Sequence, residues 1–132
     1  MTQEDKELLL KDLCARLDTN LVCSIYRTDD EGVGYRDEIL HGYCKGDIWY
    51  EFYFREDCSI GIDNVSKIKP YLFPLSSMTE EQEKEYNNLN CYELGCFPHS
   101  EEALDFLTKN HFDYRHLIEK GFAIDATGLN IY

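Results

Sequence analysis

A run of alternating side chains at residues 47–55 constrains the fold of this chain more than any other feature. Large apolar residues occupy its even positions, and charges bound and interrupt its odd positions, in the order DIWYEFYFR. Strict alternation with a period of two is typical of a β-strand that buries one face. We therefore expect the even positions to enter a core. We expect Trp49 to pack under the first helix, and the alternative leaves Trp49 and Tyr53 on a second surface that suits a ligand or peptide groove.

The chain has the size and composition of one globular domain. It has 132 residues, of which 43% are hydrophobic and 14% aromatic, and this composition excludes a disordered chain. We expect residues 1–132 to share one core that buries about two thirds of the unfolded surface. No apolar run approaches the roughly 18 residues of a membrane span. The polar, acidic start at residues 1–6 lacks a secretory signal, so we expect a cytoplasmic protein without membrane contact.

Six cysteines stand in the chain, and in a secreted protein they would suggest three disulfides. Because no secretory signal precedes them, we expect reduced thiols. Cys14, Cys23, Cys44 and Cys58 fall within expected helix or strand segments, where a free cysteine behaves as a small buried apolar residue. The other two lie in an expected loop at 90–99 and bear on metal binding.

The negative charge of the chain increases toward its C-terminal end. The formal net charge is −13, from 26 acidic and 13 basic residues. Residues 76–132 contribute −7 of this charge, because they hold eleven acidic and four basic residues. Such a field repels phosphate backbones, so direct nucleic-acid binding is not expected. The charge is compatible with a basic protein partner, with mimicry of nucleic-acid charge, or with solubility alone.

The remaining periodicities predict an α+β fold. Leucines at helical spacing predict a helix at 2–17 that begins with a capping box of Thr2 and Asp5. In the β region at 21–72, β-forming runs between turns predict antiparallel strands at 21–27, 38–44, 48–54, 58–62 and 65–72. We expect these strands to form a small antiparallel sheet or an SH3-like, partly open barrel. Pro70 and Pro74 are expected to stop further pairing.

The C-terminal third, residues 76–132, is predicted to be mainly helical. Capping signals open three helices there, namely Thr79 with Gln82, then Ser100, then Asp113. The expected helices span residues 79–90, 100–109 and 113–121.

A cysteine and histidine cluster is the sharpest metal candidate. Cys91, Cys96 and His99 follow one another at a spacing that zinc ligands use, and the loop that holds them can fold back toward His111. Zinc takes four thiolate or imidazole ligands in a tetrahedron, and this set supplies them. The alternative is that the cysteines are structural and the histidines lie on the surface. The lack of a tight Cys-x2-Cys turn favours this alternative over zinc.

A second constellation packs titratable groups into residues 111–116. His111, Asp113 and His116 have the chemistry of a general base, its orienting carboxylate and a second imidazole, so they are the candidate catalytic residues. No serine in a glycine elbow accompanies them. The structural alternative makes Asp113 a helix cap and pairs Arg115 with nearby glutamates.

Three separated segments resemble one family. The segments are LLLKDLCARL at 8–17, IKPYLFPLSSMTEE at 68–81 and HFDYRHLIEKG at 111–121. In this order they resemble a family of small proteins encoded in gut-bacterial genomes and in their phages or mobile elements. The family pattern reads FDYRGLI where this chain has His116 in place of the glycine. The resemblance implies a bacterial, cytosolic accessory protein and carries no activity with it.

The charge pattern and the lack of a convincing catalytic set favour a non-catalytic interaction or accessory protein that engages a protein partner. The candidate interaction residues are the glutamates that open the helix at 79–90 and two aromatic residues of the central strand, namely Glu80, Glu81, Glu83, Glu85, Trp49 and Tyr53. No phosphate-binding loop is present, so no cofactor is expected apart from zinc as the alternative. Two other functions stay open, a small metal-dependent or Cys/His hydrolase and a mimic of nucleic-acid charge.

Overall fold

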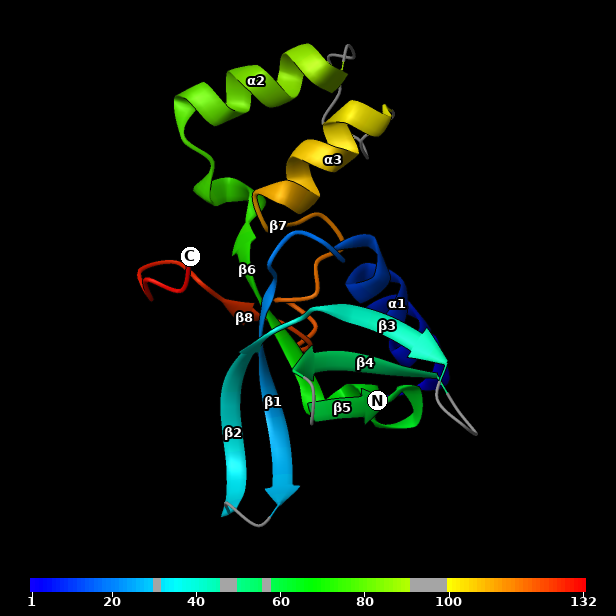
Figure 1. Cartoon of the computed structure of the whole chain (residues 1–132). Helices are drawn as coiled ribbons and strands as arrows, with labels where there is room; N and C mark the ends of the chain where they lie inside the picture. Colours follow the sequence, from blue (N-terminus) through cyan, green and yellow to red (C-terminus); the bar gives the residue numbers. More distant parts are fainter. Residues whose placement is uncertain (30–31, 46–49, 56–57, 91–99) are drawn as a thin grey trace.

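The computed structural model describes residues 1–29, 32–45, 50–55, 58–90 and 100–132. These residues form a mixed α+β structure, with one α-helix before the strands (Figure 1). In chain order the elements are α1 (Gln3–Ala15), β1 (Val22–Asp29), β2 (Gly32–Ile39), β3 (Gly42–Lys45), β4 (Tyr50–Arg55), β5 (Cys58–Gly61), η1 (Ile62–Lys67), β6 (Ile68–Pro74), η2 (Leu75–Ser77), α2 (Glu80–Asn90), α3 (Glu101–Lys109), β7 (Phe112–Asp113) and β8 (Ile124–Asp125). Across the described ranges, no helix combines the length and apolar character that a membrane crossing needs.

The strands form two sheets. The larger sheet has the order β2-β1-β6-β7, with β8 also paired to β6, and the smaller has the order β3-β4-β5. β1 pairs with β2 and β6 in antiparallel register, and the smaller sheet is antiparallel throughout. β7 and β8 pair with β6 in parallel register. The larger sheet is therefore mixed, whereas the sequence predicts antiparallel pairs alone.

The expected SH3-like barrel is not what the described strands form. The single strand predicted at 38–44 is broken at Leu40 and His41, where the chain leaves one sheet and enters the other. The Leu40 amide donates to the Leu21 carbonyl at 2.8 Å, and the His41 amide donates to the Tyr53 carbonyl of β4, also at 2.8 Å. Leu40 is buried at this switch. Because a buried residue anchors the change of sheet, the described strands divide into two sheets and do not close into a barrel.

β6 pairs with three strands, β1, β7 and β8, although its prolines are predicted to stop pairing. Pro70 lies opposite Cys23 at the end of the β1 ladder, and Pro74 lies opposite Asp113 in β7. Proline has no amide hydrogen, so it fits where one ladder ends and another partner takes over. Beyond Pro70, β6 pairs with β8 and then with β7. The prediction that pairing stops is therefore wrong for Pro70, whereas β6 and its pairing do end at Pro74.

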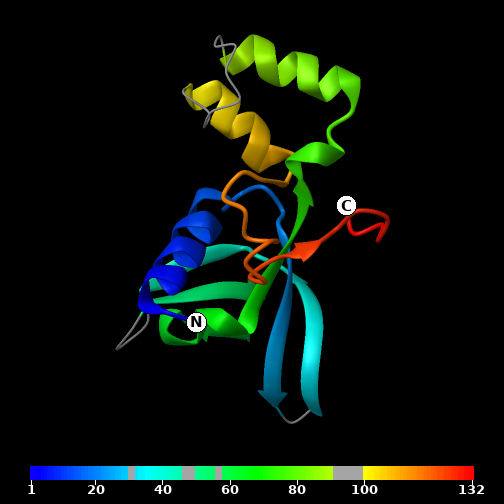
Figure 2. The same cartoon turned by 180° about the vertical axis from the view of Figure 1, so that it is seen from behind.

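α1 packs against the strands as its leucine stripe predicts. Its first turn contains the expected capping box, in which Thr2 and Asp5 exchange two hydrogen bonds of 3.1 Å. The helix then directs Leu9 and Leu13 into the main hydrophobic cluster, which it shares with residues of β1, β4, β5, η1 and β6. Figures 1 and 2 show α1 beside the small sheet from two sides.

The alternation predicted for residues 47–55 is confirmed where the structure describes it. In β4, Phe52 and Phe54 are 0% and 1% exposed, whereas Glu51 and Tyr53 are half-buried. The two described even positions, Phe52 and Phe54, therefore enter the main cluster. Trp49 lies outside the described residues.

The expected helix at 113–121 is absent, so the C-terminal third is less helical than predicted. After α3 the chain makes the short strand β7, a series of turns and the short strand β8. His116 has φ of 61°, inside the range of the predicted helix. A left-handed residue of this kind cannot continue a right-handed helix, which explains the turns. Asp113 still accepts hydrogen bonds from two amides, those of Leu117 and Ile118, each at 2.9 Å, but it orders a turn and not a helix.

α2 and α3 form a helical hairpin with its own hydrophobic cluster. Phe106, Leu107, Phe112 and Tyr114 are buried in this second cluster, and partly buried residues of β6, α2 and α3 pack against them. The predicted caps are both present, because Thr79 and Gln82 exchange hydrogen bonds and Ser100 accepts from the Ala103 amide. Figures 1 and 2 show this helical hairpin at the opposite end of the molecule from the end of β1 and the start of β2.

Candidate functional site

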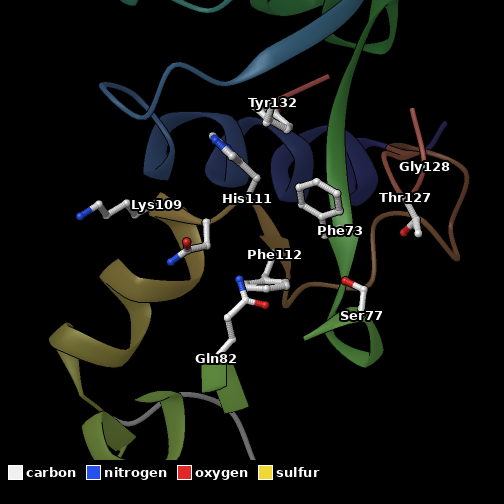
Figure 3. A pocket seen from close by; sticks show the side chains of 10 residues that line it. Phe73, Ser77, Gln82, Lys109, His111, Phe112, Thr127, Gly128 and Tyr132 are labelled. Atoms are coloured by element: carbon white, nitrogen blue, oxygen red, sulfur yellow. The ribbon is translucent and has the colours of Figure 1, made fainter. Parts of the chain in front are cut away.

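A cavity lies where the helical hairpin meets the sheet and the last residues of the chain. Its volume is about 360 Å³. It is lined by residues from β6, η2, α2, the end of α3, β7 and the C-terminal segment, namely Phe73, Ser77, Gln82, Lys109, Asn110, His111, Phe112, Thr127, Gly128 and Tyr132 (Figure 3). We call it the tail cavity.

His111 lies on the wall of the tail cavity, with a positive φ and a buried side chain. Its backbone has φ of 62°, which ends the turn after α3, and its side chain is buried. Its Nδ1 atom is buried and has no hydrogen-bond partner among the described residues. Burial and, to a smaller extent, the charge of Arg16 lower the pKa of His111 to about 4. The imidazole is therefore neutral in neutral solution.

Tyr132 covers this imidazole. The two rings are stacked with centroids 3.8 Å apart and an angle of 10° between their planes. The Tyr132 hydroxyl accepts from the Val22 amide at 3.0 Å and donates to the Tyr71 carbonyl at 2.8 Å. Desolvation by burial raises the pKa of the Tyr132 hydroxyl, so it stays protonated as this donor. These contacts fix the C-terminal segment across β1 and β6 and complete one wall of the cavity.

A buried network of ion pairs adjoins Phe112, one of the residues that line the tail cavity. Asp12 of α1 is fully buried and accepts from Arg16 Nε at 2.8 Å and from Arg115 Nε at 3.2 Å. Arg16 Nη2 also donates to the Phe112 carbonyl at 2.6 Å, which joins α1 to β7. Both guanidinium groups lie over the ring of Tyr114, at 5.3 Å and 4.9 Å from its centroid. Arg115 thus pairs with an aspartate of α1, whereas the sequence predicts nearby glutamates as its partners.

The three candidate catalytic residues do not share one cavity. His111 lines the tail cavity, whereas Asp113 and His116 line a second cavity of about 230 Å³. The Asp113 carboxylate is buried and occupied by the amides of residues 117 and 118. His116 is exposed, and its Nδ1 atom is 3.8 Å from a carboxylate oxygen of Glu119. The structure therefore brings Asp113 and His116 together and leaves His111 apart.

The candidate zinc ligands are mostly beyond what the structure describes. Cys91, Cys96 and His99 lie outside the described residues, so only His111 of this set has a known position. Within the described ranges, no three His, Cys, Asp or Glu side chains come together in a way that could hold a metal ion. Cys14, Cys23 and Cys44 are free thiols, as the sequence predicts for them. Burial raises the pKa of Cys23, which keeps this thiol protonated.

The candidate interaction residues differ in their surroundings. All four glutamates of the set, Glu80, Glu81, Glu83 and Glu85, are exposed on α2. Tyr53 is half-buried on β4.

Sequence reasoning missed most of the tail cavity. Of its lining residues, only His111 is a candidate in the sequence, whereas Phe73, Lys109 and Tyr132 carry no motif that marks them. These residues are distant in the chain and meet only because β6 pairs with β7 and the C-terminal segment crosses β6. Arg16 was also missed, although its spacing of four residues from Asp12 is a recognisable signal of a helical ion pair.

Comparisons with known proteins do not add to this description: no protein-family model, no curated protein and no solved structure matches the chain.

Proposed function

We propose that this protein is a non-catalytic accessory protein that binds a basic protein partner through the acidic face of the α2–α3 hairpin. This acidic face consists of seven carboxylates on the two helices, namely Glu80, Glu81, Glu83, Glu85, Glu101, Glu102 and Asp105. We also propose a bacterial origin, in a phage or mobile element, on the basis of the resemblance to proteins of gut bacteria.

The observation that carries the proposal is the exposure of these carboxylates. All seven are exposed, and the structure records no ion pair for any of them among the described residues. The apolar side chains of the hairpin turn inward instead, where Tyr86 packs against Phe106 with ring centroids 6.3 Å apart. The second hydrophobic cluster therefore lies between the two helices that carry the acidic face.

The local charge favours a partner with a matching basic patch. The two helices carry seven carboxylates against two lysines, Lys84 and Lys109. Charges of one sign on an exposed surface steer a partner of opposite sign and speed its association. Binding of this kind weakens as salt screens the charges, with a Debye length of about 8 Å at physiological ionic strength.

Affinity capture from bacterial lysate at two salt concentrations tests the proposal. The bait variant Glu81→Gln/Glu83→Gln/Glu85→Gln removes three charges from the acidic face and keeps the shape of each side chain. We expect the unmodified protein to retain a basic partner at low salt and to lose much of it at about 0.5 M salt. The variant is expected to retain little of this partner even at low salt.

The matched control removes the same charge elsewhere. Glu4, Glu7 and Glu119 are exposed and lie outside the hairpin. The variant Glu4→Gln/Glu7→Gln/Glu119→Gln is expected to retain the partner as well as the unmodified protein does. Equal loss in both variants would show that net charge alone matters, and capture of no basic protein at low salt would contradict the proposal.

A further inference from the structure

The tail cavity differs in charge from the rest of the molecule. Of the 132 residues, 26 are acidic, yet among the described residues that line this cavity none is Asp or Glu. Lys109 is the one charged residue of that lining, and it is exposed at the rim. An anion that enters the tail cavity therefore meets no acidic side chain among these lining residues, and Lys109 is the cation at its rim.

A second cation, Arg16, lies next to the cavity wall, in the buried network where two arginines share the single carboxylate of Asp12. Arg16 donates to the carbonyl of Phe112, a lining residue, at 2.6 Å. Burial and, to a smaller extent, the charge of Arg16 lower the pKa of His111, and the same charge partly offsets the rise that burial causes in the pKa of Tyr132. The Nη1 atom of Arg16 has no hydrogen-bond partner among the described residues. The electrostatic environment of the tail cavity thus favours a negative ligand.

The walls of the tail cavity are flat and aromatic. The rings of Phe73 and Phe112 have centroids 6.4 Å apart, and those of Phe73 and Tyr132 are 5.9 Å apart. His111 adds a neutral ring stacked on Tyr132. Flat rings pack well against a flat aromatic ligand, in offset or edge-to-face geometry.

Two amide side chains supply polar contacts at the edge. Gln82 uses its Oε1 atom to accept from the Thr79 amide at 2.9 Å, which leaves its NH₂ group as a donor. Gln82 and Phe112 both line the tail cavity (Figure 3). Asn110 uses its Nδ2 atom to donate to the Phe106 carbonyl at 2.8 Å, which leaves its oxygen as an acceptor. The lining of the tail cavity thus combines aromatic rings with polar groups, and polar groups in such a site fix the orientation of a small ligand.

From these features we infer that the tail cavity binds a small aromatic anion, with one flat ring system and one carboxylate or phosphate group. The ring system lies against Phe73, Phe112 and Tyr132, and the anionic group lies toward Lys109. The volume of about 360 Å³ is near the lower end for small-molecule sites and suits a ligand with a single ring system. This inference is independent of the acidic face and of any protein partner.

Three probes distinguish the effect of the ligand's charge on binding from the effect of its flat ring. Indole-3-acetate has a flat ring and a negative charge, tryptamine has the same ring with a positive charge, and cyclohexylacetate has the negative charge on a ring that is not flat. Their dissociation constants for the full chain are measured by saturation-transfer NMR at neutral pH. We expect indole-3-acetate to bind about ten-fold more tightly than tryptamine and more tightly than cyclohexylacetate.

A pair of lysine variants locates the site. Lys109→Gln removes the cation at the rim, and Lys84→Gln removes an exposed lysine of α2 that does not line the tail cavity. Both residues are exposed helical lysines, so neither change should disturb folding. We expect Lys109→Gln to weaken the binding of indole-3-acetate about four-fold. Lys84→Gln is expected to leave this binding unchanged. Equal or tighter binding of tryptamine, no binding of any probe, or equal effects of the two variants would each overturn the inference.

Discussion

His111 shows how one residue links the tail cavity to stability. Its pKa is about 4 in the folded protein and near 6.5 in an unfolded chain, because burial and Arg16 disfavour the charged imidazole. The unfolded state therefore binds the proton more readily between these two values. The contribution of neutral His111 to the free energy of unfolding is fully present above about pH 6.5 and is lost as the pH falls toward 4.

We predict that His111→Asn reduces this loss of stability in acid. Asparagine tolerates the positive φ of this position and does not titrate there. Between pH 6.5 and about 4, the unmodified protein is expected to lose up to about 3 kcal/mol relative to the variant. Urea unfolding at a series of pH values measures this difference.

The control for this prediction is His116→Asn. His116 has nearly the same positive φ, 61°, but its side chain is 56% exposed. Its replacement is expected to leave the pH profile close to that of the unmodified protein. Parallel profiles for His111→Asn and the unmodified protein would contradict the assignment of His111 as a buried neutral imidazole.

At the scale of elements, α2 and α3 depend on their own hydrophobic cluster. Phe106 is 8% exposed and lies between Tyr86 and Phe112, with ring centroids 6.3 Å from each. The main cluster, which includes Phe52, has no described residue of α2 or α3, although β6 contributes to both clusters. Elements that rest on separate clusters can open separately.

We predict that Phe106→Ala loosens the hairpin and spares the sheet. The truncation of a buried phenylalanine costs about 3–5 kcal/mol, and here the cost falls on contacts of α2, α3 and β7. In hydrogen exchange, amides of α2 and α3 are expected to lose protection while those of β1 and β6 keep it. Phe52→Ala, in the main cluster, is the comparison and should lower protection in both regions. Equal loss across the two regions in Phe106→Ala would show that the clusters unfold as one.

At the scale of the whole molecule, the net charge of −13 opposes folding, because carboxylates come closer together in the compact state. The exposed carboxylates of the hairpin are part of this repulsion. Salt screens it, and the Debye length falls from about 30 Å at 0.01 M to about 8 Å at 0.15 M ionic strength.

We predict that the unfolding temperature rises when sodium chloride increases over that range. The variant Glu81→Gln/Glu83→Gln/Glu85→Gln starts with three fewer charges on α2, so it is expected to gain less from the same salt. Differential scanning calorimetry measures both shifts. An unfolding temperature that stays constant or falls with salt would mean that attractive ion pairs outweigh the repulsion.

The sequence by itself determined those features that depend on neighbouring residues. The alternation around Phe52 and Phe54, the leucine stripe of α1 and the caps at Thr2, Thr79 and Ser100 are all local patterns, and the structure confirms them. Each pattern specifies its own element because a strand or helix exposes side chains with a fixed period.

Only the tertiary structure decided the division into two sheets, the turns after α3 and the tail cavity. The sheets divide at Leu40 because that residue is buried between them, and the predicted third helix is interrupted because His116 takes a left-handed backbone. The tail cavity joins Phe73, His111 and Tyr132, which are far apart in the chain. Contacts between distant segments have no period that a sequence can display, so they appear only when the packed chain brings those segments together.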